Sequence, residues 1–533
     1  MVVLMENKRV SDENEVVERL VLTGNDLTLE DVIDVARNYK KVEIAESAIE
    51  AVNDSRKIID EIVDNERVVY GVTTGFGSLC NVSIPRDDCV QLQENLIRTH
   101  SSGFGNPLAE DAVRAVMLIR INSLLKGYSG IRMSTINTLL SMLNAGVCPH
   151  IPEKGSLGAS GDLAPLAHMV LPMLGLGKAY FHGELMAGAD AMAKAGVEVI
   201  QLEAKEGLAL INGTTVLTGI GALATYDAIQ LLKLSDIVGA LSLEAHRGIE
   251  SPFKEELHLI RPQSGQLATA RNIRRLIENS TLTTEATTER VQDAYSLRCM
   301  PQIHGASKDT IAYVKEKVEI EINSVTDNPI ITRSGEVISG GNFHGEPMAQ
   351  PFDFLGIGVS EIGNVSERRI ERLVNTSLSH LPSFLVKHPG LNSGFMITQY
   401  AAASLASENK ILSHPASVDS IPSCENQEDF VSMGTTAARK ARDIVGNSRR
   451  ILATEFMAAC QAIDFRLEER NFSLGKGTQI AYDKFREAIK LIENDKDIEM
   501  YDELEKATQV LIDGELLQAV EQEVTLDIQF SDL

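Results

Sequence analysis

The chain has 533 residues, of which 44% are hydrophobic and 23% are charged, and this composition is typical of a folded globular protein. The formal net charge is −25 and no strong basic patch offsets it, so we expect no binding to nucleic acid. No apolar run approaches the roughly 20 residues that span a bilayer, so we expect no membrane-spanning segment.

The N-terminal part of the chain mixes helical and strand patterns. The first residues, Met1 to Glu6, have no basic region followed by a long apolar core, so we expect no signal peptide. The run Val68-Val69-Tyr70 predicts a short strand. We therefore assign residues 1–110 to a mixed α/β domain.

Helical patterns dominate the rest of the chain. No proline occurs between Pro172 and Pro252 or after Pro422, and such gaps favour long helices because proline costs about 3 kcal/mol inside one. Apolar residues recur at helical spacing, so that they share one helix face, in segments 113–124 and 359–374. Long helices are therefore expected in these parts of the chain.

The predicted fold class is mainly α. We expect a long helical bundle over 111–480 and a charged helical tail over 481–533. The short runs Ile330-Ile331 and Val337-Ile338 predict one small hairpin within the bundle region. An elongated bundle has much apolar helix surface, and burial of part of it between chains favours a homo-oligomer.

Cysteine and histidine usage bears on the compartment and on metals. The six cysteines form no C-x-x-C pair, which favours reduced thiols in the cytoplasm over a disulfide framework. The eleven histidines form no H-x-x-x-H or H-x-x-E pattern, so we expect no bound metal.

A glycine-rich segment from Gly155 to Pro165 interrupts the helical background. In one interpretation it is a loop in which Ser160 or Asp162 caps a helix that begins near Pro165. It lacks the Lys-Ser/Thr of a phosphate-binding P-loop.

The tripeptide Ala159-Ser160-Gly161 allows a second interpretation. Gly161 has no side chain, so its amide nitrogen can approach the carbonyl carbon of Ala159 in a tight turn. Attack there closes a five-membered ring, and loss of water from the ring and from Ser160 leaves an exocyclic methylene group. The product is a strong electron sink, which ordinary side chains do not offer and cofactors usually supply.

The run Gly155-Ser-Leu-Gly-Ala-Ser-Gly-Asp-Leu-Ala-Pro-Leu-Ala-His168 resembles the signature of the aromatic amino acid ammonia-lyase family, which includes related aminomutases. Further segments in family order extend the resemblance from about residue 65 to about residue 460. It implies an ammonia-lyase/fumarase-like helical fold. It also implies the prosthetic group 4-methylideneimidazole-5-one (MIO), formed autocatalytically from Ala159-Ser160-Gly161.

Three segments before residue 215 carry predicted site residues. The resemblance implies that Tyr70, on a mobile glycine-rich loop, is an acid/base candidate and that His100 contacts the substrate side chain. It places the Asn212 amide beside the MIO ring. Without the resemblance, Tyr70 would be a half-buried strand residue, His100 a structural histidine, and Asn212-Gly213 a helix C-cap.

Gln292, Tyr295 and Arg298 are three residues apart and share one face if the segment is helical. The planar fork of Arg298 suits an α-carboxylate, although a surface ion pair is the plainer interpretation. The resemblance implies that Gln292 and Arg298 hold the carboxylate, while Asn212 and Tyr295 polarise the MIO and the amine.

The substrate side chain is expected to meet Phe343, the apolar Met396 and the acidic Glu428. A carboxylate beside a phenyl ring would be desolvated at a cost of several kcal/mol, about 2–7. Beside an imidazole it gains about 1.5–3 kcal/mol. Glu428 and His100 therefore point to the histidine branch of the family.

Three positions depart from the pattern of the histidine branch: Thr73, Thr99 and Phe430. They keep a tyrosine or phenylalanine ammonia-lyase, or a tyrosine 2,3-aminomutase, as the alternative. A non-catalytic helical scaffold is an alternative of another class, because fold and function separate readily.

The function implied by the resemblance is elimination of ammonia from L-histidine to give trans-urocanate, a step of histidine catabolism. Ser160 would supply the MIO methylene, and Tyr70 or Glu428 would take the β-proton. The implied partners are a small amino acid substrate and three further copies in a homotetramer whose active sites are shared between chains.

Overall fold

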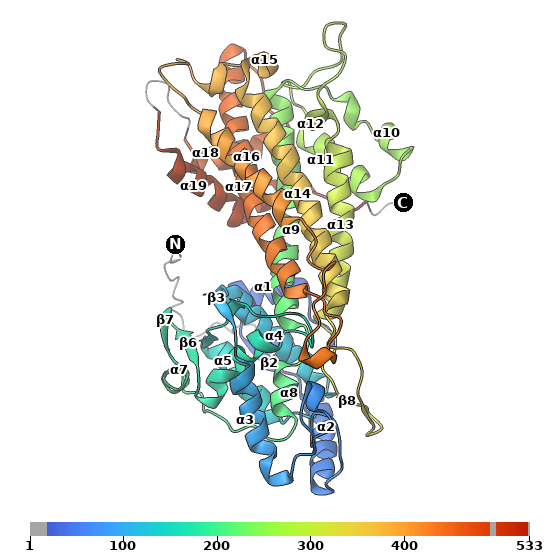
Figure 1. Ribbon diagram of the computed structural model, residues 1–533. Coiled ribbons are helices and arrows are strands. Elements are labelled where there is room, and N and C mark those ends of the chain that lie inside the picture. Colours follow the sequence, from blue (N-terminus) through green and yellow to red (C-terminus); the bar gives the residue numbers. More distant parts are fainter. Residues whose placement is uncertain (1–18, 491–496, 531–533) are drawn as a thin grey trace.

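The fold is mainly α-helical, as predicted. The computed structural model describes residues 19–490 and 497–530, so the expectation about Met1 to Glu6 lies outside the described residues. Within the described part, twenty α-helices alternate with short strands. Figure 1 shows a long helical bundle standing on a lower part that is built mainly from residues before 215.

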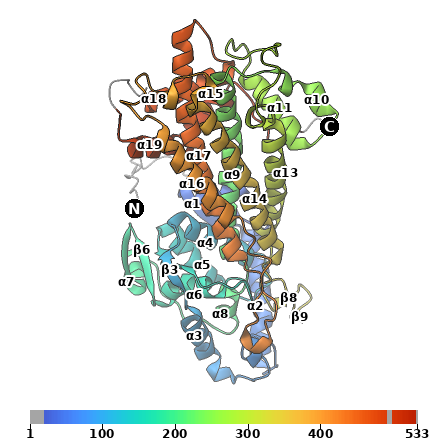
Figure 2. The same cartoon turned by 45° about the horizontal axis from the view of Figure 1, so that its top comes forward.

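The bundle consists of five long helices that lie side by side in Figures 1 and 2. They are α9 (Thr215–Ala245), α13 (Met300–Glu321), α14 (Glu346–Val374), α16 (Met396–Leu412) and α17 (Gly434–Glu469). Helices α9 and α17 occupy the two proline-free segments, so the prediction of long helices there is confirmed. Smaller helices surround the bundle: α10 (Glu255–Leu259), α11 (Ser264–Leu276), α12 (Tyr295–Arg298), α15 (Thr376–Ser379), α18 (Lys476–Ala488), α19 (Met500–Ile512) and α20 (Glu515–Glu521).

The lower part combines short helices with small sheets. Strands β1 and β2 pair in parallel, β3 pairs with β5, and β4, β6 and β7 form a three-stranded antiparallel sheet. Its elements are β1 (Leu20–Leu22), α1 (Leu29–Arg37), β2 (Val42–Ile44), α2 (Glu46–Asp64), α3 (Cys89–His100), β3 (Phe104–Pro107), α4 (Glu110–Leu125), α5 (Met133–Ala145), β4 (Cys148–Pro149), β5 (Pro152–Lys154), α6 (Leu163–Val170), β6 (Lys178–Phe181), β7 (Glu184–Ala187), α7 (Gly188–Lys194) and α8 (Glu206–Ile211). One continuous apolar core joins this part to the bundle.

Helix α4 is buried on all sides, although its sequence shows one apolar face. Its polar side chains are buried because they bind backbone carbonyls of neighbouring segments. Arg114 Nη2 donates to Val35 O at 2.8 Å, and Asn122 Nδ2 donates to Ile322 O at 2.9 Å. Hydrophobic periodicity predicts the helix but not the burial of its polar face, because Arg114 and Asn122 count as polar in the pattern.

The predicted hairpin is confirmed, because β8 (Ile330–Ile331) pairs antiparallel with β9 (Val337–Ile338). The strand predicted at 68–70 is wrong. The segment is a turn in which Thr73 N–H donates to Val69 O at 3.1 Å and Thr73 Oγ1 accepts from Val69 N–H at 3.0 Å. These local bonds use the groups that a strand would offer to a partner.

Helix α9 is long and apolar enough to cross a membrane by length and composition alone, which the sequence did not lead us to expect. However, 78% of its apolar window is buried inside the protein. Such a helix is typical of the centre of a bundle, where helices are hydrophobic on every face.

A network of buried charges joins the bundle helices. Asp236 of α9 accepts from Lys308 of α13 at 2.6 Å, and Arg369 of α14 forms two bonds with Glu455 of α17, at 2.5 and 2.9 Å. The C-terminal tail completes the network, because Asp527 O accepts from Lys308 Nζ at 3.1 Å. These interactions fix the helices relative to one another.

Replacing Arg369 with Met should reduce stability far more than replacing its neighbour Arg368 with Met. R369M leaves the fully buried Glu455 without its cation, which costs about 3–5 kcal/mol. Arg368 is 58% exposed, where an ion pair contributes about 0–1 kcal/mol. Urea unfolding followed by circular dichroism measures the stability of both variants. Equal unfolding midpoints for R369M and R368M would contradict the role of the network.

Candidate active site

The tripeptide Ala159-Ser160-Gly161 lies in the loop between β5 and α6 and packs against Gly213, which separates α8 from α9. Asp162 N–H donates to Gly213 O at 2.8 Å, and Gly213 N–H donates to Ser160 O at 3.3 Å. Gly161 has φ +70°, and a Cβ atom there would lie 2.1 Å from Gly213 O. Only glycine fits this position.

Ser160 is held by Asn212, the residue that ends α8. Ser160 Oγ donates to Asn212 Oδ1 at 2.7 Å, and Asn212 Nδ2 donates to Asn328 O at 2.9 Å. Behind it, Asp327 Oδ1 contacts the same amide at 3.3 Å while Oδ2 binds Lys205 Nζ at 2.7 Å. The Asn212 amide is thereby fixed with its oxygen toward Ser160.

Asp162 stands at the N-cap position of α6, which begins at Leu163, but its side chain makes no capping hydrogen bond there, so the capping interpretation is right in the position and wrong in the bond. Asp162 Oδ2 accepts instead from Val216 N–H at 3.0 Å and Leu217 N–H at 2.8 Å, and so caps α9. Its other oxygen accepts from Thr435 in the first turn of α17. Complete burial raises the pKa of Asp162, although these donors act in the opposite direction. One carboxyl group thus ties the tripeptide loop to two bundle helices.

A cavity of about 320 Å³ lies over the tripeptide. His100 at the end of α3, Ser160, and Glu428 from the segment between α16 and α17 line it together. Ser423 Oγ donates to Glu428 Oε2 at 3.1 Å. This volume suits a small-molecule ligand, for which pockets of about 300–1,000 Å³ are usual.

Tyr70 lies on a loop that contacts the segment carrying Glu428. Its hydroxyl accepts from Gly77 N–H at 3.3 Å, and Ser78 N–H donates to Cys424 Sγ at 3.3 Å. Burial raises the pKa of Tyr70, helped by the nearby Glu428. Burial lowers the pKa of His100, although the nearby Glu428 acts in the opposite direction, and this favours the neutral imidazole.

Phe343 follows β9 in a turn at the same end of the bundle. The adjacent His344 Nε2 lies 3.2 Å from Phe430 O, two residues from Glu428 in the sequence, and Gly345 packs against Ser432. Ser432 Oγ in turn donates to Gly158 O at 3.1 Å. The turn therefore belongs to the tripeptide end of the molecule.

Gln292, Tyr295 and Arg298 lie at the opposite end of the bundle (Figure 1). Asp293 Oδ2 accepts from Ile249 N–H at 2.7 Å, just beyond the C-terminus of α9, whereas Asp162 caps its N-terminus. Helix α9 has 31 residues, so its ends are about 46 Å apart at about 1.5 Å per residue. Only residues 295–298 are helical, so the three side chains do not share a helix face.

Met396 is also distant from the tripeptide. It begins α16, and Phe395 N–H donates to Phe384 O at 3.1 Å in a segment where Lys387 binds Glu468 at 2.8 Å. Glu468 stands at the end of α17, whereas Thr435 at its start binds Asp162. A single chain therefore brings Tyr70, His100, Asn212 and Glu428 to the end of the molecule that carries Ser160, together with the turn of Phe343. It does not bring Gln292, Tyr295, Arg298 or Met396 there.

The sequence analysis missed the pair Lys205 and Asp327, which stands behind Asn212. Lys205 is fully buried and has φ +72°, which is unusual for a residue with a side chain. The two residues are 122 positions apart, so no local pattern could have joined them. In the described residues, no group of three His, Cys, Asp or Glu side chains is placed to hold a metal ion.

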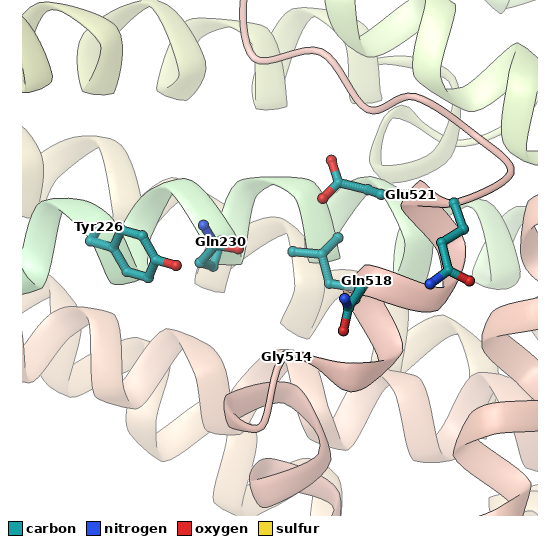
Figure 3. A pocket seen from close by; sticks show the side chains of 7 residues that line it. Tyr226, Gln230, Gly514, Gln518 and Glu521 are labelled. Atoms are coloured by element: carbon teal, nitrogen blue, oxygen red, sulfur yellow. The ribbon is translucent and has the colours of Figure 1, made fainter. Parts of the chain in front are cut away.

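A second hollow, of about 390 Å³, lies between α9 and α20 (Figure 3). Tyr226 and Gln230 line it from α9, and Gln518 and Glu521 line it from α20. Glu521 is already paired with Lys233 at 2.7 Å, and none of the predicted site residues lies there. The cavity over Ser160 is therefore the candidate active site.

Residues 27–487 match the family model described as aromatic amino acid lyase. The chain is 76% identical to a histidine ammonia-lyase of Streptococcus pyogenes over 509 residues, which cover 96% of this chain and 99% of that protein. The crystal structure of histidine ammonia-lyase from Trypanosoma cruzi is 40% identical, has a TM-score of 0.89, and is matched over 96% of each chain. A tyrosine aminomutase from Streptomyces globisporus is 38% identical with a TM-score of 0.91, over 96% of this chain and 100% of that one.

Replacing Asp162 with Asn should destabilise the junction of the loop with α9. Asparagine keeps one oxygen for the two N–H groups of α9 and turns its NH₂ group toward two hydroxyls, so bonds to a charged acceptor become bonds to neutral groups, each weaker by about 1 kcal/mol. Asp309 is the matched control, because it accepts one backbone bond at the start of α11 (Gly265 N–H, 2.7 Å) that D309N can keep. Thermal unfolding and hydrogen exchange at Val216 and Leu217 measure the effect, and equal losses in both variants would refute it.

Proposed function

The chain belongs to the aromatic amino acid lyase family, and on that premise we propose that it eliminates ammonia from L-histidine to give trans-urocanate. The observation that carries the substrate assignment is the shared cavity in which His100 and Glu428 face Ser160. A carboxylate and a neutral imidazole can both bond to the substrate ring. The identity to curated histidine ammonia-lyases supports the same assignment.

The tripeptide fits the formation of MIO. Among the described residues no hydrogen bond uses the Gly161 N–H, so the nitrogen that must attack the Ala159 carbonyl is available. Packing against Gly213 holds the turn tight, and Asn212 holds the Ser160 hydroxyl that must leave as water. Once formed, MIO supplies an electrophile that turns the substrate amine into a better leaving group.

The residues of this chain have separable roles around that group. Glu428, oriented by Ser423, and neutral His100 would bind the imidazole of the substrate. Asn212, whose amide nitrogen is bound to Asp327 and Asn328, would accept from the reacting centre through its oxygen. Phe343 would cover the substrate from the turn after β9.

Two groups are candidates for taking the β-proton, Tyr70 and Glu428. The raised pKa of Tyr70 favours its protonated form, which can donate a proton to a leaving amine. To accept the β-proton, Tyr70 must first lose its own. Glu428 lines the cavity and needs no such step when it is ionised.

Three residues depart from the pattern of histidine ammonia-lyases, and they give little reason to change the substrate assignment. Thr73 uses its hydroxyl within its own turn, where it donates to Arg67 O at 2.6 Å. Phe430 is 59% exposed and stacks on His344, with ring centroids 6.1 Å apart, outside the cavity lining. Thr99 does line the cavity, where its hydroxyl donates to Asn95 O at 2.9 Å and lies 3.1 Å from His100 Nδ1, so it contacts the substrate-binding ring through His100.

The carboxylate-binding residues must come from another copy of the chain. Gln292, Tyr295 and Arg298 lie the length of α9 away from Ser160, yet Tyr295 is 70% exposed and can face a neighbour. We therefore propose a homotetramer with shared active sites, in which Met396 also enters from a second copy.

An exposed apolar face supports this assembly. Tyr313 and Ile320 of α13 and Phe354 and Ile357 of α14 are each more than 40% exposed, and the rings of Tyr313 and Phe354 are 6.2 Å apart. Apolar surface of this kind on a bundle is typical of an interface. We also propose a cytoplasmic location, because all six cysteines are free thiols.

The purified enzyme, offered equal histidine and tyrosine, should form urocanate in excess over coumarate. E428Q should lower kcat/KM for histidine about 10- to 100-fold, the loss of one charge-assisted hydrogen bond. If Glu428 binds the imidazole only, turnover of tyrosine survives in E428Q. If it is the base, kcat collapses for both substrates. E425Q, in the same loop at an exposed position, is the control. Predominance of coumarate from the wild type would overturn the substrate assignment.

Mixed oligomers test the shared site. S160A and R298A chains should each be inactive alone, whereas their co-expression should restore about one quarter of wild-type activity, because random pairing joins an intact Ser160 to an intact Arg298 in that share of sites. S160A mixed with N212A is the control. Ser160 and Asn212 are 2.7 Å apart in one chain, so no mixed site contains both. Equal recovery in the two mixtures, or none in either, would contradict shared sites.

A further inference from the structure

Gln292 and Arg298, which we call the carboxylate clamp, lie in a segment with very little secondary structure. Helix α12, which carries Tyr295 and Arg298, has four residues, and Gln292 precedes it in a segment without regular structure. So short a helix cannot hold its own geometry, since one turn is unstable in isolation. Something outside it must fix the direction of the Arg298 side chain.

Arg290 anchors the start of this segment to the end of α9. Its Nη1 donates to His246 O at 3.0 Å and to Arg247 O at 2.9 Å, the carbonyls just beyond the last helical residue. Its Nε donates to Asp293 Oδ1 at 2.9 Å. One planar guanidinium group therefore joins a helix end to an acidic side chain, which a lysine cannot do with the same geometry.

Asp293 continues the connection toward the clamp. Its side chain is 1% exposed, and Oδ2 accepts from Ile249 N–H at 2.7 Å. Its backbone carbonyl accepts from Arg298 Nε at 2.9 Å. The Arg298 guanidinium also lies over the Tyr295 ring, 4.7 Å from its centroid.

These contacts leave one edge of Arg298 for a ligand. Arg298 Nε is bound to Asp293 O, and one face of the guanidinium lies on the Tyr295 ring. The edge formed by Nη1 and Nη2 can therefore bind a carboxylate through two parallel hydrogen bonds. The orientation of that edge depends on where Asp293 O lies, and Arg290 fixes Asp293.

We propose that Arg290 and Asp293 are positioning residues for the substrate carboxylate, acting through Arg298. The proposal rests on the function proposed above, in which Arg298 binds that carboxylate in a site completed by a second copy. Loss of the Arg290 anchor lets residues 290–298 shift against α9, so the clamp loses its bidentate geometry while the imidazole-binding residues at the other end stay in place.

The test compares two ligands that differ in the carboxylate. Imidazolepropionate carries one, whereas imidazolepropanol has an alcohol in its place and is otherwise the same. In calorimetric titration of the full-length oligomer, R290M should raise the Kd of imidazolepropionate at least about tenfold and leave that of imidazolepropanol within about twofold. R290K keeps the charge but not the fork, so it should fall between wild type and R290M.

Arg274 provides the matched control at the same end of the bundle. It likewise donates to a backbone carbonyl, Phe253 O at 2.7 Å, and pairs with Glu255 at 3.3 Å, and neither of these bonds reaches residues 290–298. R274M should leave both Kd values within about twofold of wild type. D293N, which retains an oxygen for Ile249 N–H, is the second variant should R290M fail to fold.

Equal weakening of both ligands in R290M, or of neither, would overturn the positioning role. Failure of the substrate assignment looks different, because wild type would then bind neither imidazole ligand tightly. In that case hydroxyphenylpropionate and hydroxyphenylpropanol form the matched pair, and the same selective loss of the carboxylate ligand is expected. Absence of that selectivity in both pairs would overturn the proposal.

Discussion

The structure depends on one buried carboxyl group, that of Asp162. It caps α9 through two backbone N–H groups and accepts from the first turn of α17, while its own backbone holds Gly161 against Gly213. A helix N-terminus provides unpaired donors and favours an acceptor there. The same residue thus joins the longest buried helices to the tripeptide, and the bundle becomes the rigid support on which a tight peptide turn can be held.

The length of α9 divides the proposed site in two. The helix ends at Ala245, close to the segment that carries Arg298, and begins beside Ser160, so no single chain can use both ends at once. In the homotetramer that we propose, the imidazole-binding and carboxylate-binding halves would belong to different copies, and the packing of the bundles would set the distance between them.

The sequence predicted most of the fold and part of the site. The long helices and the hairpin could be predicted because hydrophobic periodicity and turn residues are local features of the sequence. Tyr70, His100, Asn212 and Glu428 were predicted from the family resemblance. The strand predicted at 68–70 is wrong because two hydrogen bonds between Val69 and Thr73, one donated by each backbone N–H, outweigh strand propensity. The partners of Asp162 and of Lys205 lie far along the chain, where no local pattern reaches. The domain boundaries near 110 and 480 stay predictions.

The central claim is that the backbone at residues 159–161 condenses on itself. Intact-mass spectrometry of the denatured, freshly purified chain tests it most directly, with the activity of the same sample recorded beforehand. We expect a mass lower than that of the encoded chain by two water molecules. A fully active preparation with the unreduced encoded mass would contradict it.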